Sequence, residues 1–257
     1  MLGVDFTNTD GHVIDWPRLR AAGKSFAFVR ATSGTYPDAS FARVWPAMKL
    51  ARIRRGAIHV YRHGHDPIAQ AVQFLKTVQL QRGDLPPVLD LETDQSARSR
   101  AQHVREWLSI VETELEARHG HTIRPMIHTS EHAWRALDAT PGFDAYPLWV
   151  VDPTTLENPR APAPWGHDQW TVHKYGRLAN ESGRAMDLDR FNLFKLGDRG
   201  RCIMRIKELL RLAGYDAGTG AEFDDSVRRQ VMRFQSSRDL PQHGIVDADT
   251  FAELQWP

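Results

Sequence analysis

The stretch PPVLDLE, at residues 86–92, combines the signal of a buried strand with two closely spaced carboxylates. Two prolines precede an apolar run, and Asp90 and Glu92 end it. Because side chains alternate between faces along a strand, we expect both carboxylates to point the same way. Where two carboxylates share a site, one can keep its proton near neutral pH while the other stays ionised. Glycosidic bond cleavage needs such a pair, and two solvated acids at a strand end are the structural alternative.

Strand and helix signals alternate on both sides of this stretch. Short apolar runs predict strands at residues 2–6, 26–29, 56–61, 87–91 and 125–128. Capping residues and helical spacing predict helices at residues 15–23, 41–51, 67–78, 97–118 and 130–137. Three further strands, with no helices between them, are predicted at residues 148–151, 169–172 and 185–188. The prolines within residues 152–166 exclude a regular helix there.

This order of elements predicts a closed barrel. Five strand–helix units and then three strands indicate an α/β fold, an irregular TIM-like (β/α)5(β)3 barrel, with an open doubly wound sheet as the alternative. Functional groups of such barrels gather at the C-terminal ends of the strands. Asp5, Asp187 and Asp189 would then meet the carboxylate pair of the fourth strand, unless single acids only cap loops. No glycine-rich phosphate loop follows a strand, so we expect no nucleotide site.

The character of the sequence changes after residue 191. Amphipathic spacing predicts three short helices around residues 203–210, 227–234 and 251–254, a unit near the lower size limit for independent folding. We therefore divide the chain into a barrel domain at residues 1–193 and a second, small three-helix domain at residues 196–257. The junction has no long Pro, Gly or Ser linker, so the domains are expected to lie close together.

Composition excludes several classes of protein. The chain has 257 residues with 33 basic and 32 acidic side chains, which argues against a dedicated nucleic-acid binder. Its one cysteine, Cys202, cannot form an internal disulfide and is expected to be a packed thiol. No secretory signal is visible, and no apolar stretch approaches the about 20 residues that span a bilayer. We expect a soluble chain, made in the cytoplasm, that inserts into no membrane and reaches its target by another route.

The first domain, from Leu2 to about Asn192, resembles glycoside hydrolase family 25, the Chalaropsis-type lysozymes. The matching segments are GVD at 3–5, IDW at 14–16, FAFVRAT at 26–32, GAIHVYR at 56–62, PVLDLE at 87–92, LWV at 148–150, QWT at 169–171 and MDLDRF at 186–191. The resemblance implies hydrolysis of the β-1,4 bond between N-acetylmuramic acid and N-acetylglucosamine in bacterial peptidoglycan, without a cofactor. It assigns the general acid to Glu92 and places Asp90, Asp5 and Asp187 in the same cleft.

Side chains in the matching segments are also candidate contacts with the sugars. They are Tyr61, Arg30, Trp149, Gln169 and Trp170. Aromatic residues in barrels are as often simple packing. Retention of the anomeric configuration can use an enzyme carboxylate or the substrate's own 2-acetamido group. We favour the acetamido group, oriented by Asp90 or Asp187.

The chain departs from the family pattern at several positions. Thr7, Thr9 and Asp10 stand where the family often has Ser, Trp and Gln; Ser33 stands at a Glu position, His128 at a Tyr position and Asp189 at the final Asn. The catalytic carboxylates are kept. The departures therefore bear on contacts with sugar and on preference among modified peptidoglycans.

The C-terminal domain resembles the common three-helix peptidoglycan-binding module. The segments that carry the match are LGDRG at 196–200, FD at 223–224, VMRFQ at 231–235, LP at 240–241 and GIVD at 244–247. The resemblance implies peptidoglycan as the partner, with the stem peptide as a candidate ligand. A wall-binding module in a chain with no visible secretory signal is typical of a phage endolysin. A bacterial autolysin or an exported effector is the alternative.

Two other functions are compatible with parts of the sequence. A zinc-dependent hydrolase of peptidoglycan or phosphoesters would draw its ligands from His59, His63, His65, Asp66 and His128. No helical His-Glu-x-x-His motif supports it. A catalytically inactive wall-binding protein with a degenerate barrel is the other alternative, and retention of all four carboxylates argues against it.

Overall fold

A computed structural model describes residues 1–6, 14–92, 101–137, 142–153, 158–179 and 185–257. The departures at Thr7, Thr9 and Asp10 lie outside these ranges. The strands are β1 (Leu2–Phe6), β2 (Lys24–Ser33), β3 (Tyr36–Pro37), β4 (Arg54–Val60), β5 (Val88–Asp90), β6 (Met126–Ser130), β7 (Leu148–Val151), β8 (Val172–Ala179) and β9 (Ala185–Phe191). The helices that follow the first five barrel strands are α1 (Trp16–Ala21), α2 (Phe41–Leu50), α3 (Pro67–Thr77), α4 (Ala101–His119) and α5 (Glu131–Ala136).

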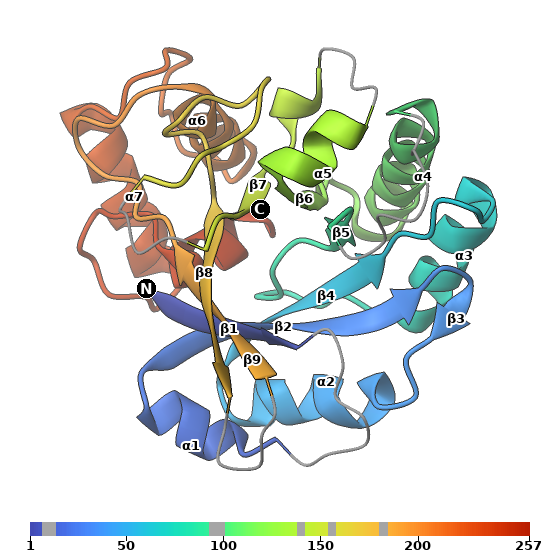
Figure 1. The fold of residues 1–257 in the computed structure, drawn as a ribbon. Helices are drawn as coiled ribbons and strands as arrows, with labels where there is room; N and C mark the ends of the chain where they lie inside the picture. The colour runs from blue at the N-terminus through green and yellow to red at the C-terminus, as the bar shows by residue number, and fades with distance from the viewer. Residues whose placement is uncertain (7–13, 93–100, 138–141, 154–157, 180–184) are drawn as a thin grey trace.

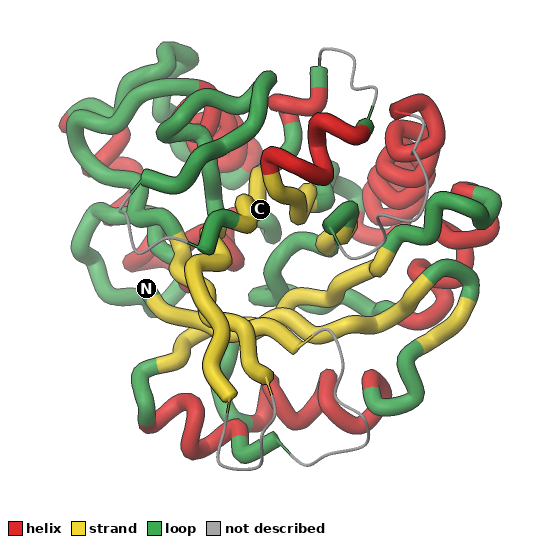
Figure 2. The backbone as a smooth tube through the Cα atoms, viewed as in Figure 1, coloured by secondary structure: helices red, strands yellow, loops and turns green. Residues whose placement is uncertain are grey.

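Eight of these strands close a barrel (Figure 1). Hydrogen bonding follows the order β1-β9-β8-β7-β6-β5-β4-β2, and β1 pairs again with β2, so the ring has no open edge. Figure 2 shows the strands at the centre, with helices around part of the ring. The closed ring confirms the predicted TIM-like barrel and excludes the open doubly wound sheet. The two-residue β3 only extends the end of β2.

The last two strands differ from the prediction. Of the predicted strand at residues 169–172, only Val172 lies in a strand, after a bend at Thr171. Strand β8 begins at Val172 and forms an antiparallel hairpin with β9. β9 is also antiparallel to β1, whereas the other neighbouring strands of the ring run parallel. Asp187 therefore reaches the C-terminal end of the barrel from the beginning of β9 rather than from its end.

Polar side chains set the starts of three barrel helices, and two of these caps, Asp15 and Ser130, are the ones that the sequence predicts. Asp15, Asp66 and Ser130 each accept a hydrogen bond from the backbone amide three residues further on, at 2.9, 2.9 and 3.1 Å. These caps satisfy amides that a helix start leaves without an intrahelical partner. Asp66 thereby ends the loop that follows β4, and Ser130, the last residue of β6, leads directly into α5.

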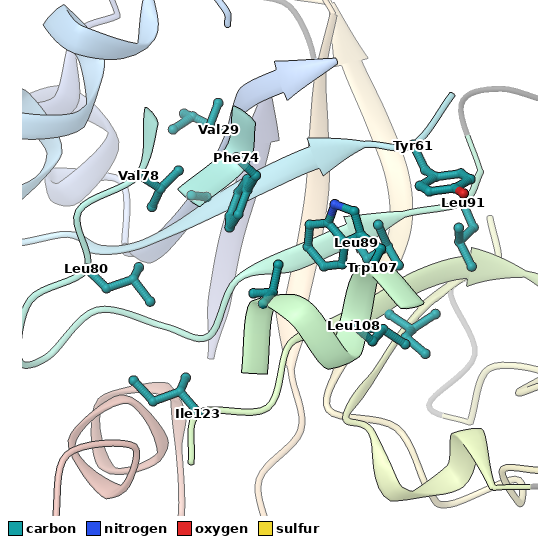
Figure 3. Close-up of a cluster of buried hydrophobic side chains, with 14 of the residues drawn as sticks. Val29, Tyr61, Phe74, Val78, Leu80, Leu89, Leu91, Trp107, Leu108 and Ile123 are labelled. Carbon is teal, nitrogen blue, oxygen red and sulfur yellow. The ribbon is translucent and has the colours of Figure 1, made fainter. Parts of the chain in front are cut away.

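Helices α3 and α4 cover the outer face of the sheet through a layer of large buried side chains. Figure 3 shows Trp107 and Leu108 of α4 beside Phe74 of α3 and Leu89 of β5. None of these four side chains is more than 1% exposed. Burial of side chains of this size contributes about 1.5–3 kcal/mol each. This layer therefore holds β4 and β5, and with them the segment that carries Asp90, firmly in place.

The three-helix module, residues 196–257, lies against the end of the barrel where the parallel strands begin (Figure 1). Its helices are α6 (Arg201–Leu212), α7 (Asp225–Ser237) and α8 (Ala248–Leu254). Phe251 of α8 packs on Phe191 of β9 with 5.4 Å between ring centroids. Trp256 donates its Nε1–H to the carbonyl oxygen of Asp84, before β5, at 3.1 Å. One hydrophobic cluster therefore runs from the barrel interior into the core of the module.

Candidate active site

Carboxylates of the first and last strands meet on the inner face of the barrel, at the end where the parallel strands finish, here called the mouth. Asp5 of β1 lies opposite Asp187 of β9 in the antiparallel ladder, and Asp189 lies opposite Gly3. Asp5 and Asp189 are buried, whereas the Asp187 side chain is 18% exposed. The structure thus brings Asp5 of the first strand together with two acids of the last strand.

Asp90 and Glu92 reach the mouth by a different route from the one predicted. Strand β5 ends at Asp90, so Glu92 lies beyond the strand and strand alternation does not position it. The Asp90 Oδ1 atom instead accepts a hydrogen bond from the Glu92 amide at 2.8 Å, which is the geometry of an Asx turn. The Glu92 Oε2 atom accepts a hydrogen bond from the Ser130 amide, at the end of β6, at 3.0 Å. A turn and a neighbouring strand therefore position Glu92.

A histidine and a tryptophan support Asp90 from below. His128 is the register partner of Asp90 on β6, and its Nδ1 atom lies 3.0 Å from Asp90 Oδ1. The His128 ring packs on the indole of Trp149 with 4.3 Å between centroids. All three side chains are buried. Trp149, which the sequence predicted to contact sugar, is instead surrounded by protein on all sides. It therefore forms the floor of the site.

Lys174 of β8 is a site residue that the sequence reasoning missed. Its Nζ atom lies 2.9 Å from Asp5 Oδ2 and 3.2 Å from Asp187 Oδ2, so one ammonium bridges both carboxylates. It also lies 5.2 Å from the centroid of the Trp149 ring. Burial favours the neutral amine, yet the neighbouring carboxylates hold the pKa of Lys174 above its ordinary value. Correct placement of β8 at residues 172–179 would have shown Lys174 pointing inward.

Burial dominates the electrostatics of the two innermost acids. It raises the pKa of Asp5 above the ordinary value, and the Lys174 ammonium opposes that rise. Burial and then the charge of Asp5 raise the pKa of Asp189 well above the ordinary value. The Asp189 Oδ1 atom accepts a hydrogen bond from Trp149 Nε1 at 3.0 Å. The mouth therefore contains carboxyl groups with different proton affinities, as acid–base chemistry requires.

Arg30 lies near the mouth, and Tyr61 lies at the same end of the barrel with its side chain turned to the outer layer. Arg30 is near the end of β2, and its Nη2 atom forms an ion pair with Asp38 Oδ2 at 2.7 Å. Tyr61 is 1% exposed and belongs to the outer layer between sheet and helices, beside Leu91 and Trp107 in Figure 3. Its burial there corrects the predicted contact between Tyr61 and sugar. Tyr61 is one residue away from the side chains of its segment that face into the barrel, so its own side chain faces outward.

The structure also places Gln169 and Trp170 away from the mouth. Gln169 lies before β8, and its side chain bonds to the module through the Arg199 carbonyl oxygen at 3.1 Å and the Cys202 amide at 3.0 Å. Trp170 is buried beneath the guanidinium of Arg190, 5.3 Å from its ring centroid. Both residues serve packing and domain contact, which corrects their predicted role in sugar binding. The family resemblance identified the segment that contains Gln169 and Trp170, but it did not show which way their side chains point.

The predicted zinc ligands do not come together. His59 points to the outer layer, where its ring nitrogens lie 2.7 Å from Thr32 Oγ1 and 3.2 Å from Gln70 Oε1. Burial lowers the pKa of His59 to about 3. His128 points to the inner face of the same sheet, and Asp66 caps α3. Within the residues that the structure describes, no group of three or more His, Cys, Asp or Glu side chains has metal-binding geometry.

Comparison with known proteins assigns the family. The family model of "Glycosyl hydrolases family 25" matches residues 4–183, which is most of the chain, and the chain therefore belongs to this family. A second model, described as "Putative peptidoglycan binding domain", matches residues 200–254. These spans fall within the predicted domains at residues 1–193 and 196–257.

Several relatives share parts of the chain. YegX of Escherichia coli (strain K12) is 31% identical over 146 residues, 54% of this chain and 51% of its own length. Lysozyme M1 of Streptomyces globisporus is 29% identical over 199 residues, 73% of this chain and 66% of its own length. The chain thus spans about half the length of YegX.

Solved structures share the barrel. The bacterial lysozyme from Streptomyces coelicolor is 29% identical, with a TM-score of 0.60, over 75% of this chain and 92% of that chain. A family 25 glycosyl hydrolase from Bacillus anthracis is 25% identical, with a TM-score of 0.60, over 74% of this chain and 88% of that chain.

Proposed function

We propose that the chain is an N-acetylmuramidase that hydrolyses the β-1,4 bond between N-acetylmuramic acid and N-acetylglucosamine of peptidoglycan. The observation that carries the proposal is the placement of Glu92, held by the Ser130 amide and adjacent to the buried Asp90 at a mouth rich in carboxylates. Two of the similar proteins, from Streptomyces globisporus and Streptomyces coelicolor, are described as lysozymes. Family membership and site geometry thus support the same chemistry.

Glu92 is the proposed general acid. It donates a proton to the glycosidic oxygen as the bond breaks, and positive charge develops at the anomeric carbon. Carboxylates placed before the reaction starts stabilise that charge without reorganisation. Asp5 and Asp187 line the inner wall of the mouth for this purpose, with Lys174 holding their orientation.

Asp187 is the proposed partner of the substrate's acetamido group. Asp90 is fully buried and already accepts hydrogen bonds from the Glu92 amide and from His128. Asp187 keeps 18% of its side chain exposed and can reach a bound sugar. Of the two carboxylates considered for this role, Asp187 therefore fits better. The acetamido oxygen would then attack the anomeric carbon in place of an enzyme nucleophile.

The Glu92→Gln variant tests the muramidase proposal. We expect turnover on purified cell walls to fall by about 10²–10⁴-fold, because the amide cannot supply the proton. The exposed Asp225→Asn variant on α7 is the control and should clear walls like the wild type. Mass analysis of the fragments should show reducing ends on muramic acid. Free stem peptides would indicate an amidase instead, and near-normal clearing by Glu92→Gln would remove Glu92 as the acid.

We further propose that the module binds peptidoglycan through its stem peptide, in the cleft between the module and the barrel. This cleft of about 330 Å3 is lined by four arginines and by the aromatic residues Tyr146, Trp165, Phe194 and Phe251. The arginines are Arg124, Arg201, Arg205 and Arg211. They outnumber the lining acids Asp144 and Glu208, which suits a peptide with free carboxylates.

Charge reversal tests the cleft. In the Glu92→Gln background, Arg124→Glu with Arg211→Glu should weaken co-sedimentation with cell walls. The matched control is Arg229→Glu, an exposed charge reversal on α7 outside the cleft. Equal co-sedimentation of both variants would contradict the proposed cleft. Walls stripped of stem peptides should bind the parent protein less, whereas unchanged binding would point to the glycan as ligand.

We also propose that the enzyme acts on the cell wall after release through a permeabilised membrane, as an endolysin does, rather than by inserting into the membrane. Among the described residues, no helix is long and apolar enough to cross a bilayer. Cells that express the protein should lyse only when a permeabilising agent is added. Spontaneous lysis at equal expression would indicate export by another route.

A further inference from the structure

We propose that Asp189 is a protonated carboxylic acid whose hydrogen bond positions Asp5 beneath the mouth. The activity part of this inference rests on the proposed muramidase function, whereas the protonation part does not. Asp189 touches no reacting atom by this account and acts through Asp5. It is therefore a positioning residue.

The strand register places the two carboxyl groups within reach of each other. Asp189 lies opposite Gly3 in the β1–β9 ladder, and Asp5 lies two residues beyond Gly3 on the same inner face. Diagonal neighbours of this kind can touch across an antiparallel pair. Gly3 has no side chain, and the ring of Phe26 occupies the space over it. The charge of Asp5 acts on the Asp189 carboxyl group, in agreement with this placement.

The oxygen atoms of Asp189 have unequal surroundings. Its Oδ1 atom accepts a hydrogen bond from Trp149 Nε1 at 3.0 Å. Its Oδ2 atom is buried and receives no hydrogen bond from a donor among the described residues. A buried oxygen that faces another carboxylate without a proton is unfavourable on two counts, desolvation and repulsion. A proton on Oδ2 removes both, because Asp189 then donates to Asp5.

The surrounding charges do not offer Asp189 a better partner. Lys174 is its register partner on β8, yet the Lys174 ammonium forms its ion pairs with Asp5 and Asp187. The other titratable or charged groups that face this cluster are Lys24 of β2, His128 of β6, Tyr175 and Arg177 of β8, and Arg190 of β9. Arg177 is exposed and pairs with Asp187. One ammonium thus serves two carboxylates, and the third is neutralised by a proton.

Burial and the charge of Asp5 both raise the pKa of Asp189, in agreement with this arrangement. A neutral carboxyl group presents one donor and one acceptor, the same pattern as a carboxamide. This equivalence explains how an aspartate can occupy the position where the family pattern often has asparagine. The acid differs in one respect, because it can lose its proton.

Loss of that proton changes the free energy of unfolding in a definite direction. Above the ordinary Asp pKa, the unfolded chain has released the proton that folded Asp189 still holds, so stability falls as the pH rises toward the raised pKa. Ionised Asp189 also repels Asp5 and competes for Lys174. Both stability and the placement of Asp5 should therefore deteriorate as the pH rises toward the raised pKa of Asp189.

The Asp189→Asn variant isolates this proton, because asparagine keeps the shape, donor and acceptor but cannot ionise. Thermal unfolding should show that the wild type loses Tm relative to Asp189→Asn as the pH rises above the ordinary Asp pKa. Infrared spectra at neutral pH should contain a protonated-carboxyl stretching band that Asp189→Asn lacks. The variant should also keep its activity on cell walls to higher pH than the wild type. Asp225→Asn, an exposed substitution on α7, is the matched control. It should behave like the wild type in thermal unfolding, in the infrared spectrum and in the pH dependence of activity.

Two results would overturn the inference. If the infrared band is absent from the wild type, Asp189 is ionised at neutral pH. If Asp189→Asn loses Tm relative to the wild type as the pH rises, Asp189 acts as a charged partner of Lys174. Both readouts need no catalysis, so they stand even if the Glu92→Gln test removes the muramidase proposal. Asp189→Ala, which lacks the donor, should lower kcat by about 10-fold or more if it folds.

Discussion

The two ends of the barrel are closed by opposite means. At the mouth, buried charges face one another, with Lys174 between Asp5 and Asp187. At the other end, the interior is closed by apolar packing, in which Phe191 of the barrel meets Phe251 of the module. The inner face of one barrel therefore carries both a reactive end and a stabilising end. Charge is tolerated only where the side chains pair, since an unpaired buried charge is costly.

This difference bears on how the module works. The module packs on the end of the barrel opposite the mouth, so it cannot close over a sugar bound there (Figure 1). Its contact with the barrel continues the barrel's own core rather than forming a mobile tether. The module thus serves the enzyme in two ways, as a cap for the interior and as the proposed wall-binding surface.

The largest effect on the apolar end is expected from Phe251→Ala. Truncating this buried ring should lower the free energy of unfolding by about 3–5 kcal/mol, because a cavity opens between module and barrel. Denaturant unfolding measures the loss. At temperatures where the variant stays folded, its kcat should match the wild type. A loss of kcat without a loss of stability would show that the apolar end of the barrel also affects catalysis at the mouth.

Lys174→Met tests the charged end and should cost about 3 kcal/mol, because Asp5 stays buried without its ion pair. Unlike Phe251→Ala, it should also lower kcat in the folded protein, since Asp187 loses its orientation. Parallel measurements of thermal unfolding and wall clearing separate the two effects. Arg177→Met is the control, because that exposed side chain also pairs with Asp187. Wild-type kcat in Lys174→Met would contradict the bridging role.

The smallest effect is expected at the polar rim of the module. Arg54 at the start of β4 pairs with Asp249 at 2.8 Å and with Glu253 at 2.9 Å. These partly exposed pairs contribute at most about 1 kcal/mol, so Arg54→Met should lower Tm slightly and leave kcat unchanged. Weaker dependence of Tm on salt in the variant would show that the pairs are screened. A loss comparable with that of Phe251→Ala would mean that ion pairs, rather than apolar packing, join the module to the barrel.

Part of the site could be predicted because it depends on short patterns. The Asp90-x-Glu92 motif follows a buried strand, and Asp5 ends the first strand, so barrel closure alone predicts their approach. The positions of Gln169 and Tyr61 could not be predicted in this way. A shift of one residue, or a bend before a strand, turns a side chain to another face, and local sequence does not record it.

The sequence by itself determined the barrel, the five helices that cover it, the module and the acids of the mouth, because periodicity, capping and strand order are local properties. Only the tertiary structure decided the reversed direction of β9 and the bridge made by Lys174, whose partner Asp5 is 169 positions away. It also decided the burial that controls the proton on Asp189. Protonation and ion pairing depend on the surroundings of a group, and those surroundings exist only once distant strands have closed the ring.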